Sequence, residues 1–382
     1  MLIENIVHSG KTFKYILARA KRMFETRLRH LAFSIMESIK TIRLGIKILF
    51  AKIIKKPIPF QVFIRVLEQC NQRCSYCKGD YPIQSFKPPT TKQLLELIDG
   101  LAYLGTKRIT LTGGEPLLRD DIHVIIRHIK SHGINASLTT NGRLINKHIK
   151  SIRDLDLLSV SIDGDRFCHD AYCGKGSYDA AIHAIKVARN IGVPVQLLCT
   201  VTRLTDPKLA SLIEIAERYD CSITFDLLNP FFNIDGSMSL RPEDAGEEAI
   251  NSFFSYQIKH RNPRVVPSLY VLKYIRNWPA SYTTFRLFYN QIPPGFKPIK
   301  CYAGHFSALI ETNGDLMPCC FMRPDYSPTN VFELGVEKAW QYMPKNNCIT
   351  CRAIGYNMFN ALFSFHFGSL SHFLKVMRKI GF

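Results

Sequence analysis

The 382-residue sequence lacks the features that would assign it to a secreted or disulfide-bonded class. Its N-terminus has no short apolar core followed by a small-residue cleavage site, so we predict no secretory signal peptide. Structural disulfides belong to oxidising compartments, so the 12 cysteines are expected to be metal ligands or buried thiols of a cytoplasmic protein. The length allows two or three domains, and a 46% hydrophobic content supplies material for a core.

The N-terminal region also lacks an uncharged run that is long enough to span a membrane. A spanning helix needs about 20 mostly apolar residues, and here Arg43, Lys47 and Lys52 interrupt the most apolar part. Residues 1–59 hold 13 Lys and Arg against three Glu, a net charge of +10 out of +19 for the whole chain. Apolar residues recur at helical spacing over 13–42, with cations on the other face.

This pattern is typical of a cationic amphipathic helix and leaves three interpretations open. We predict that residues 1–58 form a basic arm that binds the anionic surface on the inner face of a membrane. The chain would then be a peripheral membrane protein. The alternative is that the arm packs on the protein's own body. We expect no nucleic acid partner, because aromatic and basic residues are not interleaved as a stacking platform requires. The segment Lys55-Lys56-Pro57-Ile58-Pro59 is interpreted as a linker, since its prolines cannot continue a helix.

From Phe60 onward, short β-branched runs alternate with amphipathic helical stretches, which is typical of a parallel sheet built from βα units. The predicted strands are 60–67, 107–112, 134–139, 157–162, 193–201 and 221–227. The predicted helices are 91–104, 120–132, 143–151, 177–191 and 206–219, and Gly105, Gly133 and Gly192 are predicted to occupy C-cap positions. Six such units predict an α/β fold, a partial (β/α)6 TIM barrel over 59–228, whose functional residues lie at the C-terminal ends of the strands.

Three cysteines, Cys70, Cys74 and Cys77, follow the first predicted strand with the spacing C-x3-C-x2-C. Three thiolates this close in sequence can reach one metal centre. An iron–sulfur cube normally takes four cysteines, so three would leave one iron open to bind and activate another molecule. A zinc knuckle or a set of buried thiols is the alternative for the spacing alone.

Polar and glycine-rich segments follow the next three strands. They are Thr112-Gly113-Gly114-Glu115-Pro116, Thr139-Thr140-Asn141-Gly142 and Ser161-Ile162-Asp163-Gly164. Each segment alone would fit an ordinary turn, because Gly, Asn, Asp and Ser favour turns for local reasons. Placed at successive strand ends, they predict one shared binding site at the rim of the barrel.

A second cysteine set lies near the C-terminus. Cys301 precedes a hairpin predicted at Asn313-Gly314, Cys319 follows it, and the pair Cys348 and Cys351 closes the set. These four thiolates, spaced C-x17-C and C-x2-C, would complete one cube, although zinc accepts four cysteines equally well. Cys320 is an alternative ligand to Cys319, and the other four cysteines, Cys168, Cys173, Cys199 and Cys221, are expected to be buried.

The cysteine loop with Tyr76 before its last cysteine, followed one βα unit later by Gly-Gly-Glu-Pro, resembles the radical S-adenosylmethionine (SAM) superfamily over about residues 60–226. The resemblance implies a [4Fe-4S] cluster on Cys70, Cys74 and Cys77 that reduces SAM, giving a 5′-deoxyadenosyl radical that abstracts hydrogen from an unactivated C–H bond. It also implies an electron donor such as flavodoxin or ferredoxin. The residues that it places against SAM are Tyr76, Gly113, Gly114, Glu115, Pro116, Thr140, Asn141, Ser161 and Asp163.

Residues 301–352 resemble the twitch module, a truncated relative of the SPASM domain that carries auxiliary clusters in this superfamily. The full SPASM pattern needs several cysteines after Cys351 and the chain has none, so the resemblance implies one auxiliary [4Fe-4S] cluster. The segment from His169 to Gly174 is similar to a stretch of such members, which usually carry Arg where this chain has Cys173. That departure puts the transfer of their substrate contacts in doubt.

Two further segments complete the predicted organisation. Residues 229–300 are interpreted as an irregular bridging segment that contacts substrate. Residues 353–382, apolar and then basic, are predicted to form a tail with an interfacial amphipathic helix.

We therefore predict a radical SAM enzyme that acts on a lipid-like or isoprenoid-like substrate at the membrane surface. A peptide-modifying enzyme is the alternative, and a non-enzymatic iron–sulfur carrier or metal-binding scaffold is the rival from another class. A carrier of that kind is expected to have four ligands for each cluster and no Gly-Gly-Glu-Pro segment at a strand end. Fold analogy does not assign the substrate or the reaction that follows hydrogen abstraction.

Overall fold

The computed structural model describes residues 49, 52, 57–77, 87–228, 247–281, 284–321, 326–344 and 348–379. The chain divides into two units, Met1–Pro57 and Ile58–Phe382, and the second contains the architecture below. Almost all of the predicted basic arm lies outside the described residues. Within the described part of the chain, no helix is both long enough and apolar enough to cross a membrane.

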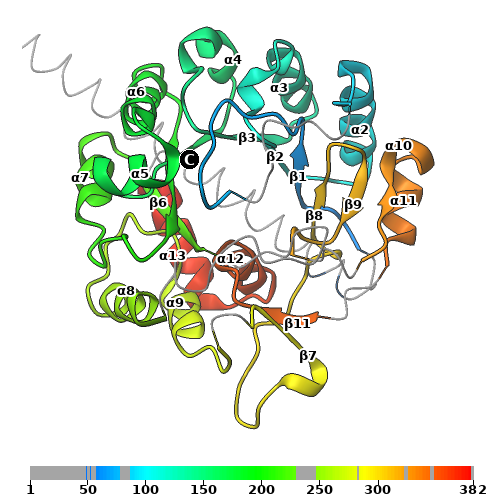
Figure 1. The fold of residues 1–382 in the computed structure, drawn as a ribbon. Helices are drawn as coiled ribbons and strands as arrows, with labels where there is room; N and C mark the ends of the chain where they lie inside the picture. The colour runs from blue at the N-terminus through cyan, green and yellow to red at the C-terminus, as the bar shows by residue number, and fades with distance from the viewer. Residues whose placement is uncertain are drawn as a thin grey trace, which may run out of the picture. The chain divides into compact units, whose positions relative to one another are not determined.

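Six parallel strands form the centre of the second unit, each paired with the next in chain order. They are β1 (Gln61–Arg65), β2 (Arg108–Thr112), β3 (Asn135–Thr140), β4 (Leu157–Ser161), β5 (Val195–Val201) and β6 (Ser222–Leu227). The helices of the βα units are α2 (Thr91–Tyr103), α3 (Ile122–Ser131), α4 (Ile149–Ile152) after the 3-10 turn η2 (Ile145–His148), α6 (Ser177–Asn190) and α7 (Ala210–Arg218). Figure 1 shows these helices around the strands, which confirms the predicted partial barrel.

The ends of these elements follow from local backbone chemistry. Gly105, Gly133 and Gly192 have φ values of 94°, 66° and 84°, the left-handed conformation predicted for them after helices. The predicted start of the helix at 206 is wrong, because α7 begins four residues later. The Asp206 carboxylate accepts bonds from the backbone N–H groups of Lys208 and Ala210 at 2.9 and 3.1 Å, which stabilises a turn before the helix.

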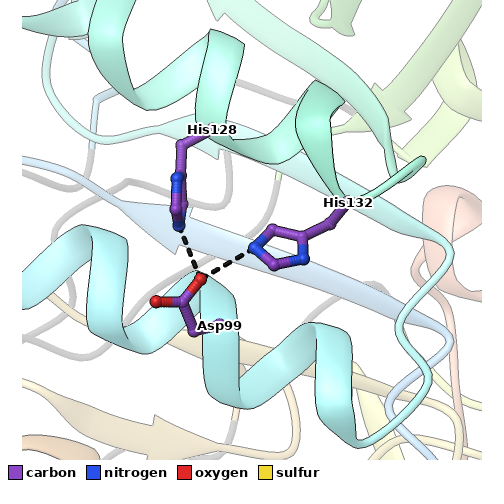
Figure 2. Close-up of side chains that lie close together, drawn as sticks. All are labelled: Asp99, His128 and His132. Atoms are coloured by element: carbon purple, nitrogen blue, oxygen red, sulfur yellow. Dashed lines mark hydrogen bonds and ion pairs between the residues drawn. The ribbon is translucent and has the colours of Figure 1, made fainter.

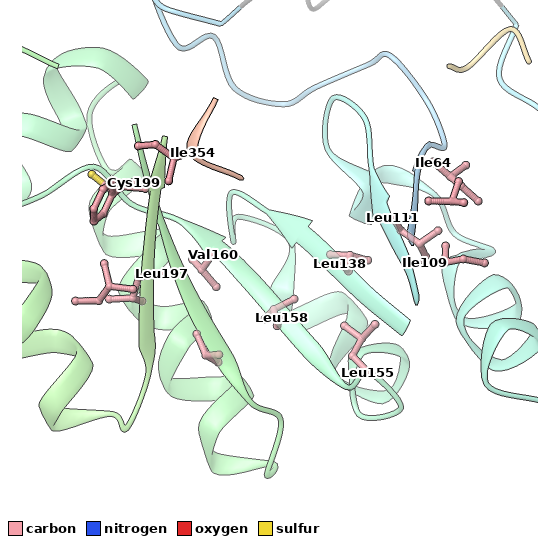
Figure 3. Packing of buried hydrophobic residues seen from close by; sticks show 14 of the residues in the cluster. Ile64, Ile109, Leu111, Leu138, Leu155, Leu158, Val160, Leu197, Cys199 and Ile354 are labelled. Carbon is pink, nitrogen blue, oxygen red and sulfur yellow. The ribbon is translucent and has the colours of Figure 1, made fainter. Parts of the chain in front are cut away.

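The outer face of the sheet carries the largest part of the core. Alternate residues such as Ile64, Leu111 and Leu158 are fully buried and face the helices, as Figure 3 shows. Burying each such side chain contributes about 1.5–3 kcal/mol. A slip of one residue would turn this apolar set to the other face, so packing fixes the register of each strand. The residues between them face the barrel interior, where polar side chains are then available for a site.

The C-terminal cysteine module extends the barrel sheet. β8 (Ser307–Ile310) pairs with β1 in parallel, β9 (Asp315–Met317) pairs with β8 in antiparallel, and β10 (Thr329–Asn330) pairs with β9, giving a nine-stranded sheet. The turn between β8 and β9 holds Gly314 at a φ of 91°, which confirms the predicted hairpin. A separate two-stranded sheet joins β7 (Arg286–Phe288) to β11 (Cys348–Cys351).

The segment predicted to be an irregular bridge contains two helices, α8 (Glu247–Lys259) and α9 (Leu269–Arg276). Ile250, Phe253 and Phe254 of α8 are buried, and the rings of Phe253 and Phe225 of β6 lie 4.9 Å apart in an edge-to-face contact. The expectation of irregular structure is wrong for this part, because an apolar helical face covers the last strand. The remaining short helices are η1 (Pro116–Leu118), α5 (Arg166–Cys173), η4 (Tyr289–Gln291), α10 (Val331–Leu334) and α11 (Val336–Tyr342).

The C-terminal residues form α12 (Ile354–Phe363) and α13 (Phe367–Lys379). The ring of Phe363 lies 5.1 Å from Phe306 and 6.5 Å from Phe60, so the apolar residues of α12 pack on the barrel. An interfacial helix is therefore the wrong prediction for this part of the tail. The edge strands of the nine-stranded sheet are β6 and β10, and α12 lies beside the β6 edge, where the Asp226 side chain bonds to its first turn. Phe367, at the start of α13, is 82% exposed.

Asp226, near the C-terminal end of β6, anchors the N-terminus of α12. Its Oδ1 accepts bonds from the backbone N–H groups of Leu227 and Ile354 at 2.9 and 3.1 Å, and its Oδ2 accepts one from Gly355 at 3.4 Å. A carboxylate at a helix N-terminus is favoured by the helix dipole. Burial nevertheless raises the pKa of Asp226 to about 6, against the effect of these hydrogen bonds.

We expect Asp226→Asn to remove one pH dependence of folding. The folded pKa of about 6 lies above the unfolded value of about 3.9, so this group's contribution is fully present below about pH 4 and is lost as pH rises through 6. The unfolding free energy of wild type relative to the variant should fall by about 2 kcal/mol over this window. A difference of one unit between the folded and unfolded pKa values is worth about 1.4 kcal/mol, and solvent contact through the cavity reduces the total. Urea unfolding at several pH values measures this difference, with the exposed Asp154→Asn as control. A pH-independent difference would contradict the assignment.

Candidate functional site

The loop with Cys70, Cys74 and Cys77 follows β1 and is fixed to α5. The backbone N–H of Ser75 donates to the Tyr172 carbonyl oxygen at 2.8 Å, and Gln72 Nε2 donates to the Cys173 carbonyl oxygen at 3.0 Å. These contacts gather the three cysteines at the C-terminal rim of the barrel.

The Cys77 thiol is close enough to the other two thiols to affect both of them. The pKa of Cys70 is raised first by burial and then by the charges of Glu115 and Cys77. The pKa of Cys74 is raised first by a hydrogen bond with Cys173 and then by burial, with a further contribution from Cys77. A cationic cluster would supply the charge that lets these thiols ionise together, so the residues fit the predicted [4Fe-4S] centre.

Gly113 and Gly114 let the backbone of the cysteine loop pass directly over the end of β2. A Cβ atom on Gly113 would lie 2.3 Å from the Leu67 carbonyl oxygen, and one on Gly114 would lie 2.1 Å from that of Gln69. Hydrogen bonds hold the contact, since the N–H of Gly114 donates to Leu67 at 3.0 Å and that of Glu115 donates to Gln69 at 2.9 Å. The two glycines therefore position the cysteine loop, and a contact between them and SAM stays a prediction.

The Glu115 side chain joins the ends of β2 and β3. It is 1% exposed, and its carboxylate accepts bonds from Thr140 Oγ1 at 2.8 Å and the backbone N–H of Asn141 at 2.8 Å. A third bond, from Leu117 N–H at 3.1 Å, caps η1, which begins at Pro116. Burial raises the pKa of Glu115 to about 7, although the three donors lower it. Asn141 Nδ2 in turn donates to Asn71 Oδ1 at 2.8 Å in the cysteine loop.

Asp163 is the centre of a second polar group at the end of β4, where Ser161 is the last strand residue. The Asp163 carboxylate is fully buried and accepts bonds from Tyr76 Oη at 2.6 Å and the backbone N–H of Thr200 at 2.8 Å. His169 Nδ1 lies 3.2 Å from the same carboxylate. Asp163 thus positions Tyr76 beside the last cysteine of the loop.

The structure therefore brings most of the predicted rim residues into one connected set. Sequence reasoning missed His169 and Thr200, although His169 belongs to a segment whose resemblance to the superfamily was noted. Cys168, Cys173, Cys199 and Cys221 are all buried, as predicted. Cys173 also contacts the site, because its Sγ lies 3.5 Å from Tyr76 Oη.

The four cysteines of the second set also meet. After burial, the pKa of Cys351 is raised by the charges of Cys301, Cys348 and Cys319. The pKa of Cys319 is raised by burial and then by Cys320, Cys301 and Cys348, and that of Cys348 by burial and then by Cys301. Every pair among the four predicted ligands is therefore close enough to interact.

The spacing of these four thiols is wider than a single zinc ion needs. Zinc at about 2.3 Å from each sulfur holds tetrahedral thiolates about 3.8 Å apart. These four cysteines belong to the described residues, and no three of their sulfur atoms all lie within 4.8 Å of one another. The arrangement fits a larger centre such as a [4Fe-4S] cube.

Cys320 faces a different space from the four. It lines a cavity of about 290 Å³ inside the barrel, together with Phe63 and Arg65 of β1, Asp226 of β6 and Tyr356 of α12. Its backbone N–H donates to Tyr356 Oη at 3.3 Å. Cys319 and Cys320 lie just after β9 and not on a strand, so the expected strand alternation does not separate their side chains.

Residues 64–215 match the family model described as the Radical SAM superfamily. The Fe-coproporphyrin III synthase of Methanosarcina barkeri is 29% identical over 168 residues, which are 43% of this chain and 41% of that protein. The probable GTP 3′,8-cyclase of Pyrococcus abyssi is 31% identical over 157 residues, 40% of this chain and 51% of that protein. The chain thus spans about half the length of these curated relatives.

Two solved structures have a similar fold. Streptococcus suis SuiB bound to the precursor peptide SuiA is 16% identical with a TM-score of 0.59, over 80% of this chain and 69% of that one. The enzyme anSMEcpe with bound AdoMet is 17% identical with a TM-score of 0.57, over 75% of this chain and 81% of that one. At these identities the likeness establishes the fold alone.

We expect Cys319 and not Cys320 to be the ligand of the second centre. Cys320→Ser should retain about eight irons per reconstituted chain, two cubes of four, whereas Cys319→Ser should retain about half of that. The reason is that the Cys319 thiol interacts with the other three predicted ligands while Cys320 lines the barrel cavity. Iron and zinc analysis of anaerobically purified protein measures both outcomes. The reverse pattern would reassign the ligand, and zinc in place of iron would discard the auxiliary cluster.

Proposed function

We propose that this chain, whose residues 64–215 match the Radical SAM superfamily model, is an enzyme that starts radical chemistry by cleaving SAM. The observation that carries the proposal is the joint geometry of the cysteine loop and the polar rim. Three cysteines lie where Glu115, Asn141 and Asp163 bring three consecutive strand ends together. When bound, a [4Fe-4S] cluster would supply the electron that converts SAM to methionine and a 5′-deoxyadenosyl radical.

The chain's own residues hold and orient these groups. Cys70, Cys74 and Cys77 would bind three irons, which leaves the fourth for SAM. Glu115 fixes Asn141 next to the loop, and Asp163 fixes Tyr76. The remaining predicted contacts of SAM, at Gly113, Gly114, Pro116, Thr140 and Ser161, are part of this proposal. An external one-electron donor such as flavodoxin or ferredoxin would reduce the cluster.

We further propose that the barrel cavity binds the substrate. Its lining includes Thr112, the residue directly before Gly113, so the cavity reaches the rim that carries the SAM site. The volume of about 290 Å³ suits one chain segment or a small ring, and a substrate that fills it would displace water from the reacting part. Cys320 lines this cavity and is adjacent to Cys319, so an auxiliary cluster on the four cysteines would lie near the product radical. Its proposed task is to accept or relay an electron.

Two substrate classes have specific support. A lipid-like or isoprenoid-like substrate fits the apolar lining, which includes Phe63, Leu309, Phe321 and Phe359, and it fits the basic N-terminal arm. A peptide substrate is the second candidate, because the fold is similar to that of SuiB bound to its precursor peptide. We place the lipid-like substrate first, at the inner surface of a membrane.

The SAM-cleaving activity is tested with anaerobically reconstituted protein, dithionite and SAM. We expect 5′-deoxyadenosine and methionine from wild type and none from Cys74→Ala, because two cysteines do not hold the cluster that reduces SAM. Cys74→Ala should keep about four irons in the auxiliary centre, since the two cysteine sets belong to different parts of the chain. Wild type that carries both clusters and forms no 5′-deoxyadenosine would support the electron-carrier alternative. Complete loss of iron in the variant would show that the two sets share one site.

Membrane attachment is tested by flotation with anionic liposomes. The full chain should float at low salt and less at high salt, because each basic residue near an anionic surface contributes about 1 kcal/mol that ions screen beyond about 8 Å. A shorter chain that begins at Pro57 lacks all of the +10 charge of residues 1–59 and should stay in solution. Equal flotation of both proteins, or none of either, would remove the main support for the lipid-like substrate and favour the peptide.

A further inference from the structure

Two histidines and an aspartate converge on the outer helical layer, as Figure 2 shows. His128 lies on α3 and His132 caps its C-terminal end, so the two side chains lie one turn apart on the same face. Asp99 lies on the neighbouring helix α2. The Nε2 atoms of His128 and His132 are 2.6 and 2.7 Å from the same oxygen, Asp99 Oδ1. The three ligand atoms all lie within 4.8 Å of one another.

The place of this cluster in the barrel separates it from the cysteine sets. Helices run antiparallel to the strands in βα units, and the three residues lie toward the C-terminal ends of α2 and α3. They are therefore at the rim where the strands begin, opposite the SAM site. The proposed reaction uses no residue at that rim, so it does not account for the cluster.

The local electrostatics favour a bound cation. The C-terminal end of a helix carries a partial negative charge, and His132 occupies that position on α3. The Asp99 carboxylate lies between the two imidazoles, with one oxygen in contact with both Nε2 atoms, and supplies a negatively charged oxygen ligand.

We propose that Asp99, His128 and His132 bind a divalent transition-metal ion such as Zn²⁺, with the fourth position left to water. Two imidazoles and one carboxylate suit zinc, cobalt, nickel or copper, and three protein ligands are typical of an open site. Zinc at about 2.1 Å from each ligand would space the ligand atoms about 3.4 Å apart, so the two contacts of 2.6 and 2.7 Å must open by about 0.7 Å. The side chains are 53%, 27% and 33% exposed, which leaves them room to move. The ion would link α2 to α3.

The test is a zinc titration of the protein with both iron–sulfur clusters in place, because empty cysteine sets would also bind zinc. Calorimetry should detect one equivalent of Zn²⁺ on wild type, together with an increase in the melting temperature. Asp99→Asn and the double variant His128→Gln/His132→Gln should weaken this binding at least about tenfold, since loss of even an outer partner of a metal site has that effect. The visible absorbance of the clusters shows whether zinc displaces iron.

The matched control is His183→Gln on α6. His183 is also exposed and its Nε2 bonds to Asn146 Oδ1 at 2.8 Å, but within the described part of the chain it belongs to no group of three ligand side chains. This variant should bind zinc like wild type. If the double variant does not fold, the near-isosteric Asp99→Asn carries the comparison alone. Wild type that binds no zinc with full clusters, or variants that bind it equally well, would overturn the proposal.

Discussion

The close passage of the cysteine loop over the end of β2 is the contact on which the rest of the site depends. Two carbonyl oxygens, of Leu67 and Gln69, lie where the Cβ atoms of Gly113 and Gly114 would be. The loop can therefore accept hydrogen bonds from the N–H groups of Gly114 and Glu115, and these bonds fix the backbone just before Cys70. Glu115 then connects the same strand end to Asn141, which reaches back to the loop through Asn71. These hydrogen bonds form a closed ring from the loop through Glu115 and Asn141 back to the loop, so each one stabilises the others.

Strand β1 relates the two cysteine sets in space. On one edge it pairs with β2 and its own end leads into the cysteine loop, and on the other edge it pairs with β8, which leads into the hairpin before Cys319. Because hydrogen bonds fix both registers, one sheet carries the loop with Cys70, Cys74 and Cys77 and the hairpin that leads to Cys319, whereas Cys348 and Cys351 lie on β11 of the separate two-stranded sheet. Phe63 and Arg65 of β1 line the barrel cavity.

The sequence predicted what depends on periodicity and local backbone chemistry. The six strands, five helices, three capping glycines and the hairpin at Gly314 were recognised because each residue type is favoured by its own local conformation. The rim residues were recognised because parallel strands place their ends together. The sequence did not predict the helices α8 and α9 or the inward packing of α12. These features depend on which apolar surface the rest of the fold leaves uncovered. The partners of Asp163 were missed for a similar reason, since Thr200 comes from another strand and bonds through its backbone.

The same distinction explains why the cysteines were easier to assign than the substrate. A buried thiolate needs a compensating cation, so clustered cysteines in an apolar interior point to a metal centre whatever the fold around them. Binding of that centre would also stabilise β11, which carries Cys348 and Cys351 and pairs with only one other strand. The cavity has no comparable constraint, because a lining of phenylalanines, one tyrosine, Arg65 and Asp226 accepts many apolar or amphipathic molecules. Under the proposed function, the reaction that follows hydrogen abstraction would depend on how the substrate lies against Asp226, Cys320 and Tyr356.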